Sequence, residues 1–154
     1  MAMTKIQEKQ NKELRLASAM NKFQELAISA VTSGNNPHFK STYSTLADVI
    51  KACRQGNQFG LFFTQHTIEK EGKCYVKTVV RHINDTDTYD ACLAVPCANL
   101  SNAHQLGSGI TYAKRFTLQS LYGLPSEDDD GNGAVTSPTI NPQVQNEINK
   151  NNIM

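Results

Sequence analysis

Three strand-like runs separated by two short turns constrain the fold of this chain more than any other part of its sequence. Each run is rich in β-branched and aromatic residues. Glu71-Gly72 separates the first two runs, and Asn84 to Asp87 separates the last two, and both are typical turn sequences. The predicted strands are residues 59–69, 73–82 and 88–96, and Pro96 ends the third. This order predicts a three-stranded antiparallel β-meander.

The second predicted strand has two chemically different faces, because successive side chains of a strand point to opposite sides of its sheet. One face is typical of a core and consists of Cys74, Val76, Thr78 and Val80. The other face presents three cations and an aromatic ring, and it consists of Lys73, Tyr75, Lys77, Val79 and Arg81. In the third strand Asp90 lies opposite the face formed by Tyr89, Ala91, Leu93 and Val95.

A long helix is predicted after the strands, over residues 102–122, with Ser101 or Asn102 as its N-cap. Its apolar face can cover the sheet and consists of Leu106, Ile110, Ala113, Thr117 and Leu121. A polar stripe at helical spacing consists of Gln105, Ser108, Tyr112, Arg115 and Gln119. Gly107 and Gly109 each cost the helix on the order of 1 kcal/mol. That cost suggests a close approach of the backbone to the sheet or to a phosphate chain.

Two helices are predicted before the strands. The first covers residues 4–31, with Thr4 as a possible cap, and the Gly34 to Pro37 segment breaks it. The second starts near Ser44 as N-cap and ends near Gly56. The fold class that follows is α+β, in which the meander packs against the long C-terminal helix and the other helices are N-terminal.

The chain divides by charge into a body and a tail. Its 154 residues are enough for one domain with a real core. Residues 1–124 contain 14 Lys or Arg and 9 Asp or Glu, a net charge of +5, whereas residues 125–154 contain one Lys and 5 acids, a net charge of −4. We therefore predict a core domain over 1–124 and a disordered acidic, Asn- and Gln-rich tail over 125–154. A basic body suits a polyanion ligand, although a merely solvated surface has the same composition.

The sequence gives no sign of a membrane span or a secretory signal, so we expect a cytoplasmic protein without membrane partners. In that compartment disulfides are not expected. None of the four cysteines forms a C-x-x-C pair. Cys74 and Cys92 fall in the predicted strands, where reduced cysteines act as small core residues. Zinc bound by Cys92, Cys97 and His104 is an alternative that the spacing supports only weakly.

Enzyme signatures are poorly matched. The Gly107 to Thr111 segment lacks the pattern of a phosphate-binding loop, and no G-x-S-x-G nucleophile elbow occurs. The acidic run from Asp128 to Asp130 could bind Mg²⁺ as nuclease carboxylates do. Adjacent acids in a glycine-flanked tail are more typical of a solvated segment. We therefore predict no catalytic residue, no metal and no cofactor.

Cations interleaved with aromatic rings favour a nucleic-acid ligand. Cations neutralise phosphates with little regard to sequence, and aromatic rings stack on unpaired bases, so this mixture suits single strands. The candidate DNA-binding residues are Lys40 and Tyr43 on a loop, Lys73, Tyr75, Lys77 and Arg81 on the second strand, and Tyr112, Lys114 and Arg115 on the last helix. The alternative is that Tyr75 and Phe39 pack in the core and the cations only make the surface soluble.

Three blocks of sequence, in a fixed order, resemble the ERF (essential recombination function) family of phage single-strand annealing proteins. The first starts at Asn36 and follows the family pattern N-P-x-F-K-S-x-Y-x-x-L. The second starts at Gly107 and follows G-S-x-x-T-Y-A-x-R-Y/F, and the third is the D-D-D-G run at Asp128. Together they span residues 36–132. Phe116 replaces the commoner Tyr, and Thr42 stands where a basic residue is frequent.

The resemblance implies an ATP-independent protein that binds single-stranded DNA and anneals complementary strands during phage recombination. It also implies a homo-oligomer, as a ring or a helical filament, and an annealed duplex intermediate. A phage exonuclease or a host single-strand-binding protein is a further candidate partner. The residues alone also allow a passive single-strand-binding protein that does not anneal.

Overall fold

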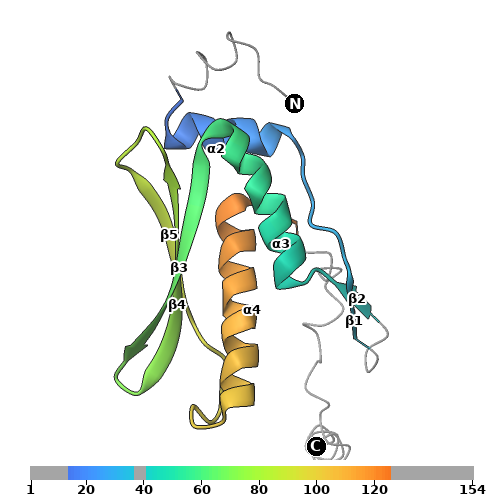
Figure 1. Ribbon diagram of the computed structural model, residues 1–154, viewed down its shortest axis with the longest axis vertical. Helices are drawn as coiled ribbons and strands as arrows, with labels where there is room; N and C mark the ends of the chain where they lie inside the picture. The colour runs from blue at the N-terminus through green and yellow to red at the C-terminus, as the bar shows by residue number, and fades with distance from the viewer. Residues whose placement is uncertain (1–13, 37–40, 126–154) are drawn as a thin grey trace, which may run out of the picture.

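The computed structural model describes residues 14–36 and 41–125 and confirms the predicted α+β fold. The large sheet has three strands, and in Figure 1 the long helix α4 lies against one face of it, with α3 on the side of α4 away from the sheet. The helices are α2 (Leu16–Glu25), α3 (Leu46–Cys53), the 3-10 helix η1 (Arg54–Phe59) and α4 (Ala103–Tyr122). The strands are β1 (Gly34–Asn36), β2 (Ser41–Tyr43), β3 (Leu61–Lys70), β4 (Lys73–His82) and β5 (Thr88–Ala94).

The large sheet is the predicted antiparallel meander, in the order β3-β4-β5. In its register Leu61 lies opposite His82, and Tyr75 opposite Ala94. The two residues between β3 and β4, Glu71 and Gly72, have φ angles of 54° and 70°, as a tight primed hairpin turn requires. The predicted strand 73–82 is confirmed residue for residue. The first strand starts later than predicted, because η1 continues to Phe59, and the third ends at Ala94 rather than Pro96.

The core lies between the sheet and α4, as the alternation in β4 predicts. Val76, Thr78 and Val80 are fully buried on the face that α4 covers, called the inner face from here on. A chain of hydrogen bonds crosses this interface. Gln65 Nε2 donates to Thr78 Oγ1 (2.8 Å), and the Thr78 and Thr117 hydroxyls lie 2.6 Å apart. Because Thr117 Oγ1 donates to Ala113 O (2.9 Å), Thr78 is the donor between the two threonines, and both of their buried hydroxyls are hydrogen-bonded.

Helix α4 has well-defined ends. Asn102 is its N-cap, and its Oδ1 accepts hydrogen bonds from the backbone N–H groups of His104 and Gln105, both at 3.1 Å. Gly123 ends the helix with a φ of 64°, a conformation that glycine adopts without strain. These observations confirm the predicted helix and settle its cap as Asn102 rather than Ser101.

The two glycines of α4 have different surroundings. A Cβ atom on Gly109 would lie 2.6 Å from Pro96 O and 2.8 Å from a Val95 methyl, so α4 comes close to the segment after β5 at this point. A Cβ atom on Gly107 would have nothing within 4 Å. The predicted close approach of the backbone to the sheet side is therefore confirmed at Gly109. At Gly107 no described part of the protein comes close, and an approach to a phosphate chain there stays a prediction.

We expect opposite effects from adding a methyl group at these two positions. Gly107→Ala should raise the free energy of unfolding by about 0.5–1 kcal/mol, because alanine restricts the unfolded chain and meets no neighbour in the fold. Gly109→Ala should lower it by about 1–3 kcal/mol through overpacking against backbone. Urea denaturation of the two variants measures the difference, and each serves as the control for the other. Equal shifts in both would contradict the packing described here.

The N-terminal helix is shorter than predicted. Residues 4–13 of the predicted helix, with the proposed Thr4 cap, lie outside the described residues. The described part ends at Glu25, and Ala27 has a φ of 49°, which α-helical geometry does not allow. The chain then runs without a helix to β1. The prediction that the helix continues to residue 31 is therefore wrong.

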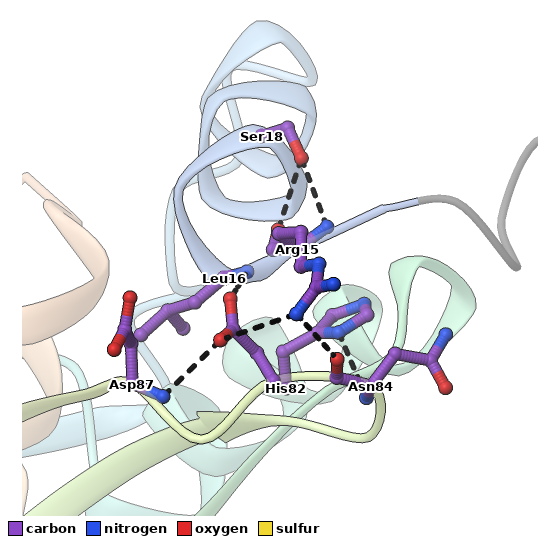
Figure 2. A network of polar contacts seen from close by, with 7 residues as sticks. Arg15, Leu16, Ser18, His82, Asn84 and Asp87 are labelled. Carbon is purple, nitrogen blue, oxygen red and sulfur yellow. Dashed lines mark hydrogen bonds and ion pairs between the residues drawn. The ribbon is translucent and has the colours of Figure 1, made fainter.

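The N-terminus of helix α2 is hydrogen-bonded to the turn between β4 and β5. The Leu16 N–H donates to Asp85 Oδ2 (2.9 Å), and Arg15 Nη1 donates to Asn84 O (3.3 Å). The Asp85 carboxylate also accepts from the Asp87 N–H. These N–H groups, Leu16 first, hold the pKa of Asp85 below its usual value. Figure 2 shows how this network joins the helix end to the turn, beside His82.

Residues 34–36 and 41–43 form a small antiparallel strand pair that the sequence analysis did not predict. β1 and β2 pair antiparallel, with Gly34 opposite Tyr43, although this segment was expected to be a loop. A Cβ atom on Gly34 would lie 2.6–2.8 Å from the Tyr43 ring, so the ring lies over bare backbone. Gly34 is thus part of a packed strand pair rather than only a helix breaker.

The cap of α3 is Thr45, one residue after the predicted Ser44. Thr45 Oγ1 accepts from the Asp48 N–H (3.2 Å), and the Asp48 carboxylate accepts in return from the Thr45 N–H (2.8 Å). The Ser33 hydroxyl also donates to Asp48. These bonds, with that of Ser33 the strongest, lower the pKa of Asp48 to about 2. Ser44 instead is buried, and its hydroxyl donates to Ala30 O (3.4 Å).

Candidate nucleic-acid interface

The face of the large sheet that points away from α4 is a basic surface. We call it the outer face. The register assigns to it Phe62, Thr64, His66, Ile68 and Lys70 of β3, Lys73, Tyr75, Lys77, Val79 and Arg81 of β4, and Thr88, Asp90, Cys92 and Ala94 of β5. It therefore carries four Lys or Arg and one acid. Within residues 14–36 and 41–125 no helix covers it (Figure 1).

Apolar and aromatic groups lie among the cations of the outer face. Phe62 is 39% exposed and Ile68 is 41% exposed. Tyr75 is half-buried and lies opposite Ile68 in the register. Its position on the outer face means that Tyr75 does not belong to the core beneath α4, which was the alternative left open by the sequence.

The cations of β4 are spaced for repeated contacts. Lys73, Lys77 and Arg81 recur every four residues, which is about 13 Å along the strand. Lys77 Nζ lies 3.2 Å from Asp90 Oδ2, and the two side chains are 41% and 47% exposed. An exposed pair of this kind contributes about 0–1 kcal/mol, so a phosphate group can replace the carboxylate at little cost. The outer face can thus bind a chain of phosphates.

A second group of candidate residues surrounds Arg115, on the side of α4 away from the sheet. The Arg115 guanidinium lies 5.2, 5.7 and 5.4 Å from the ring centres of Tyr43, Tyr112 and Phe116. Its Nη1 donates to Ser44 O (2.9 Å). The Tyr112 and Phe116 rings stack, with centres 4.2 Å apart and an interplanar angle of 27°. We call these four residues the aromatic–arginine cluster.

The cluster changes the interpretation of the predicted polar stripe on α4. Arg115 is half-buried and joins α4 to the start of α3, so its main partners are within the protein. Tyr112 and Phe116 remain 42% and 39% exposed. The sequence analysis did not select Phe116 as a site residue, although its spacing of four from Tyr112 is a signal of contact on a helix.

The predicted site residues therefore fall on two surfaces rather than one. The outer face brings together Lys73, Tyr75, Lys77 and Arg81. β2, which ends at Tyr43, lies on the side of α4 away from the sheet (Figure 1), and the Arg115 guanidinium contacts the Tyr43 and Tyr112 rings. Lys114 is half-buried beside β3, where its backbone O accepts from Gln65 Nε2 (3.0 Å). Lys40 lies outside the described residues.

Lys70, Phe62 and Ile68 are members of the outer face that the sequence analysis missed. The first predicted strand was not divided into faces, so their alternation was not used. Once β3 is paired with β4, Lys70 lies opposite Lys73 and Phe62 opposite Arg81. The register, rather than composition, places these residues with the predicted cations.

The cysteines differ in how deeply they are buried. Cys53 is buried, which raises the pKa of its thiol to about 12, and Cys74 is half-buried on the inner face. Cys92 is exposed on the outer face, so its predicted place in the core is wrong. In the described part of the chain, no three His, Cys, Asp or Glu side chains are placed to share a metal ion. The acidic run at Asp128 lies outside it.

Comparison with known protein families decides what kind of protein this is. A model described as the ERF superfamily matches residues 15–153. The chain belongs to the ERF superfamily. That result confirms the resemblance seen in the three sequence blocks and gives this chain a role in phage recombination, with DNA binding and single-strand annealing. Neither the curated proteins nor the solved structures contain a match.

The bounds of the ERF match can be compared with the first and last helices of the fold. It begins at Arg15, the residue that precedes α2, and it includes the residues after the end of α4. The division into a core domain at 1–124 and a tail at 125–154 stays a prediction, since most of the tail lies outside the described residues. No helix within residues 14–36 and 41–125 is long and apolar enough to cross a membrane.

Proposed function

We propose that this ERF chain binds single-stranded DNA along the outer face of its sheet and anneals complementary strands without ATP. The observation that supports this most is the composition of that face, where four cations oppose a single acid among exposed apolar groups. Cations supply affinity for a phosphate backbone of any sequence. Exposed rings and apolar groups add contacts that only unpaired bases can make.

In the proposed mechanism the protein holds one strand, and the two DNA strands supply the pairing. Lys73, Lys77 and Arg81 hold one strand by its phosphates and keep it extended. Its bases remain available to a second strand, whose phosphates would otherwise repel the first. Base pairing then supplies both the free energy and the sequence specificity, so hydrolysis of a nucleotide is not needed. The protein contributes charge neutralisation and presentation of the strand.

We further propose that the protein acts as a homo-oligomer, in a ring or a helical filament. β3 and β5 are the edge strands of the sheet, and among the described residues neither has a partner on its outer edge. Such edges are a common place for neighbouring copies to add. An annealed duplex intermediate, and a phage exonuclease or host single-strand-binding protein in the cytoplasm of the host, complete the set of proposed partners.

Removing the cations of β4 should selectively weaken DNA binding. In the variant Lys73→Ala/Lys77→Ala/Arg81→Ala, the loss of three phosphate contacts should make the plot of log Kd against log salt less steep by about 2. At 0.1 M salt this corresponds to about a 100-fold weaker Kd for a dT oligonucleotide. Fluorescence anisotropy over a salt series measures both quantities, and urea denaturation verifies that the variant is folded.

A matched control has the same change in charge at another place. Lys22, Lys51 and Arg54 are exposed cations on α2, α3 and η1, elements that do not form the outer face. Their triple alanine variant should bind within about threefold of the wild type. Equal losses in the two triple variants would mean that only net charge matters and that the outer face is not the binding surface.

The passive alternative is tested by the rate of pairing. With EDTA present and ATP absent, the wild type should accelerate pairing of complementary oligonucleotides, and the β4 triple variant should not. A passive coat would instead slow the reaction at saturating protein. Labelled DNA incubated with Mg²⁺ should stay intact, and its degradation would support a metal-dependent nuclease instead.

A further inference from the structure

A groove of about 420 Å³ lies between the first half of α4 and the segment that follows β5. Pro96 and Cys97 form part of one wall, and His104, Gln105, Ser108 and Tyr112 form part of the other. Its volume is at the lower end of the range of about 300–1,000 Å³ that small organic ligands occupy in proteins. No step of the proposed strand binding on the outer face uses this groove.

The walls of the groove are fixed by local contacts. Gly109 lets Pro96 approach α4 more closely than any side chain would allow. The Cys97 thiol donates to Asn99 O (3.2 Å), and Asn102 then caps the helix. The segment after β5 is therefore held at a set distance from α4, and the opening between them is part of the fold.

Tyr112 provides a flat aromatic surface inside this groove. Phe116 lies one helical turn further on and covers one side of the Tyr112 ring, at 4.2 Å between ring centres. Side chains of a helix lean toward its N-terminus, so the uncovered side of the ring looks toward Ser108 and the groove. A planar group placed there would extend the existing stack of Tyr112 on Phe116, with the Arg115 cation close to both rings.

The rim of the groove offers hydrogen-bond donors and acceptors that do not select one particular base. The Gln105 amide has both donors and an acceptor, and the Ser108 hydroxyl can serve as either. The His104 ring adds a further nitrogen pair. Bases differ in the donors and acceptors on their edges, so a rim of this kind can accept any of them while the ring face provides the affinity.

The groove is also next to the end of the outer face that carries Lys73 and Tyr75. β5 is the edge strand, and Tyr75 pairs with its last residue, Ala94. The next residue, Val95, still donates its N–H to Cys74 O (2.9 Å), and the groove wall starts at Pro96. A strand that leaves the outer face beside Tyr75 therefore reaches the groove by passing around one edge strand.

We infer that this groove binds one unpaired nucleobase of the bound strand, stacked on Tyr112 with its edge toward Gln105 and Ser108. The inference rests on the proposed function, since it needs a strand on the outer face. It assigns to Tyr112 and Phe116 the stacking of a base and to Arg115 the support of the stack. A strand anchored in this way keeps a fixed position on the protein while its other bases pair.

The test compares DNA with and without bases. The probes are a dT oligonucleotide and one of equal length in which abasic residues replace the nucleotides. The wild type should prefer the dT probe by at least about 5- to 150-fold, which is the range for stacking of one base, because bases on the outer face add to the preference. Tyr112→Leu should lower the preference by about 5- to 150-fold, and Tyr112→Phe should keep it, because the ring alone provides the stacking surface.

A second variant blocks the groove and leaves the stack in place. Ser108 is exposed and lies one turn before Tyr112, so Ser108→Phe fills the groove without entering the core. It should lower the preference for the dT probe by the same factor as Tyr112→Leu, and urea denaturation verifies that the variant is folded. The β4 triple variant should bind both probes more weakly by the same factor.

The outcomes separate this inference from the proposed function. If the wild type binds neither probe, the proposed function fails. If it binds both but without preference, or if Ser108→Phe keeps the full preference, the groove does not take a base and the inference is overturned. Sedimentation without DNA examines the other possible occupant, a second copy of the chain. A smaller oligomer for Ser108→Phe with unchanged base preference would also overturn the inference.

Discussion

Replacing Tyr122 by alanine is expected to lower the free energy of unfolding by about 3–5 kcal/mol, the largest single effect that we expect in this protein. The ring is 1% exposed at the end of α4. It meets Phe23 of α2 edge to face with ring centres 5.1 Å apart, and Phe63 of β3 in the same way at 6.2 Å. One side chain thus connects α2, the sheet and α4, and its removal leaves a cavity that all three elements surround.

The control for this prediction is Tyr122→Phe, which keeps the ring and removes the hydroxyl. The Tyr122 hydroxyl is buried and has no hydrogen-bond partner among the described residues, and burial raises its pKa. An unpaired buried hydroxyl costs about 1–3 kcal/mol. Tyr122→Phe should therefore be at least as stable as the wild type in urea denaturation. A loss of more than about 1 kcal/mol would show that the hydroxyl is bonded.

Arg115→Ala is expected to lower the free energy of unfolding by about 2–4 kcal/mol. The change removes a hydrogen bond from a charged donor to Ser44 O, worth about 1.5–3 kcal/mol, and the cation that three aromatic rings surround. It also detaches α4 from the start of α3. The sequence analysis named Arg115 as a candidate DNA-binding residue, and its contacts now predict a loss of stability for this variant.

One further variant separates charge from shape at Arg115, and a second variant on the outer face serves as the control. Arg115→Lys keeps the charge but lacks the planar guanidinium, so it should recover less than half of the lost stability. Arg81→Ala makes the same chemical change on the exposed outer face and should cost less than about 0.5 kcal/mol. Urea denaturation of all three variants measures these differences. If Arg115→Ala and Arg81→Ala are equally stable, the cluster around Arg115 does not support the fold.

The parts of the fold that could be predicted from the sequence are those with a local signal. β4 alternates in chemistry over its full length, and α4 has an apolar stripe, a cap residue and a terminal glycine. Each of these signals lies within the element itself. β1 and β2 have only three residues each, too few for a period, and their pairing depends on the packing of Tyr43 over Gly34. Such contacts cannot be read from composition.

The candidate site was predictable in kind but not in arrangement. The alternation of β4 was sufficient to predict Lys73, Lys77 and Arg81 on one face. The position of Arg115 on a polar stripe was also correct, yet its partner Ser44 is 71 residues away in the sequence. Helical spacing cannot show whether a polar residue meets solvent, DNA or a distant carbonyl. The separation of the candidates into two surfaces therefore became visible only with the packing of α4 on the sheet.

The contact between Asp85 and the start of α2 has a consequence for how the chain folds during synthesis. Leu16 leaves the ribosome 69 residues before the carboxylate that receives its N–H. At a translation rate of about 5–20 residues per second, that interval lasts about 3–14 s. A ten-residue helix is marginal in water without tertiary partners. In a growing chain α2 must therefore remain unfolded until β4 and β5 have paired. The Leu16 amide of chains stalled before residue 85 should exchange freely with deuterium.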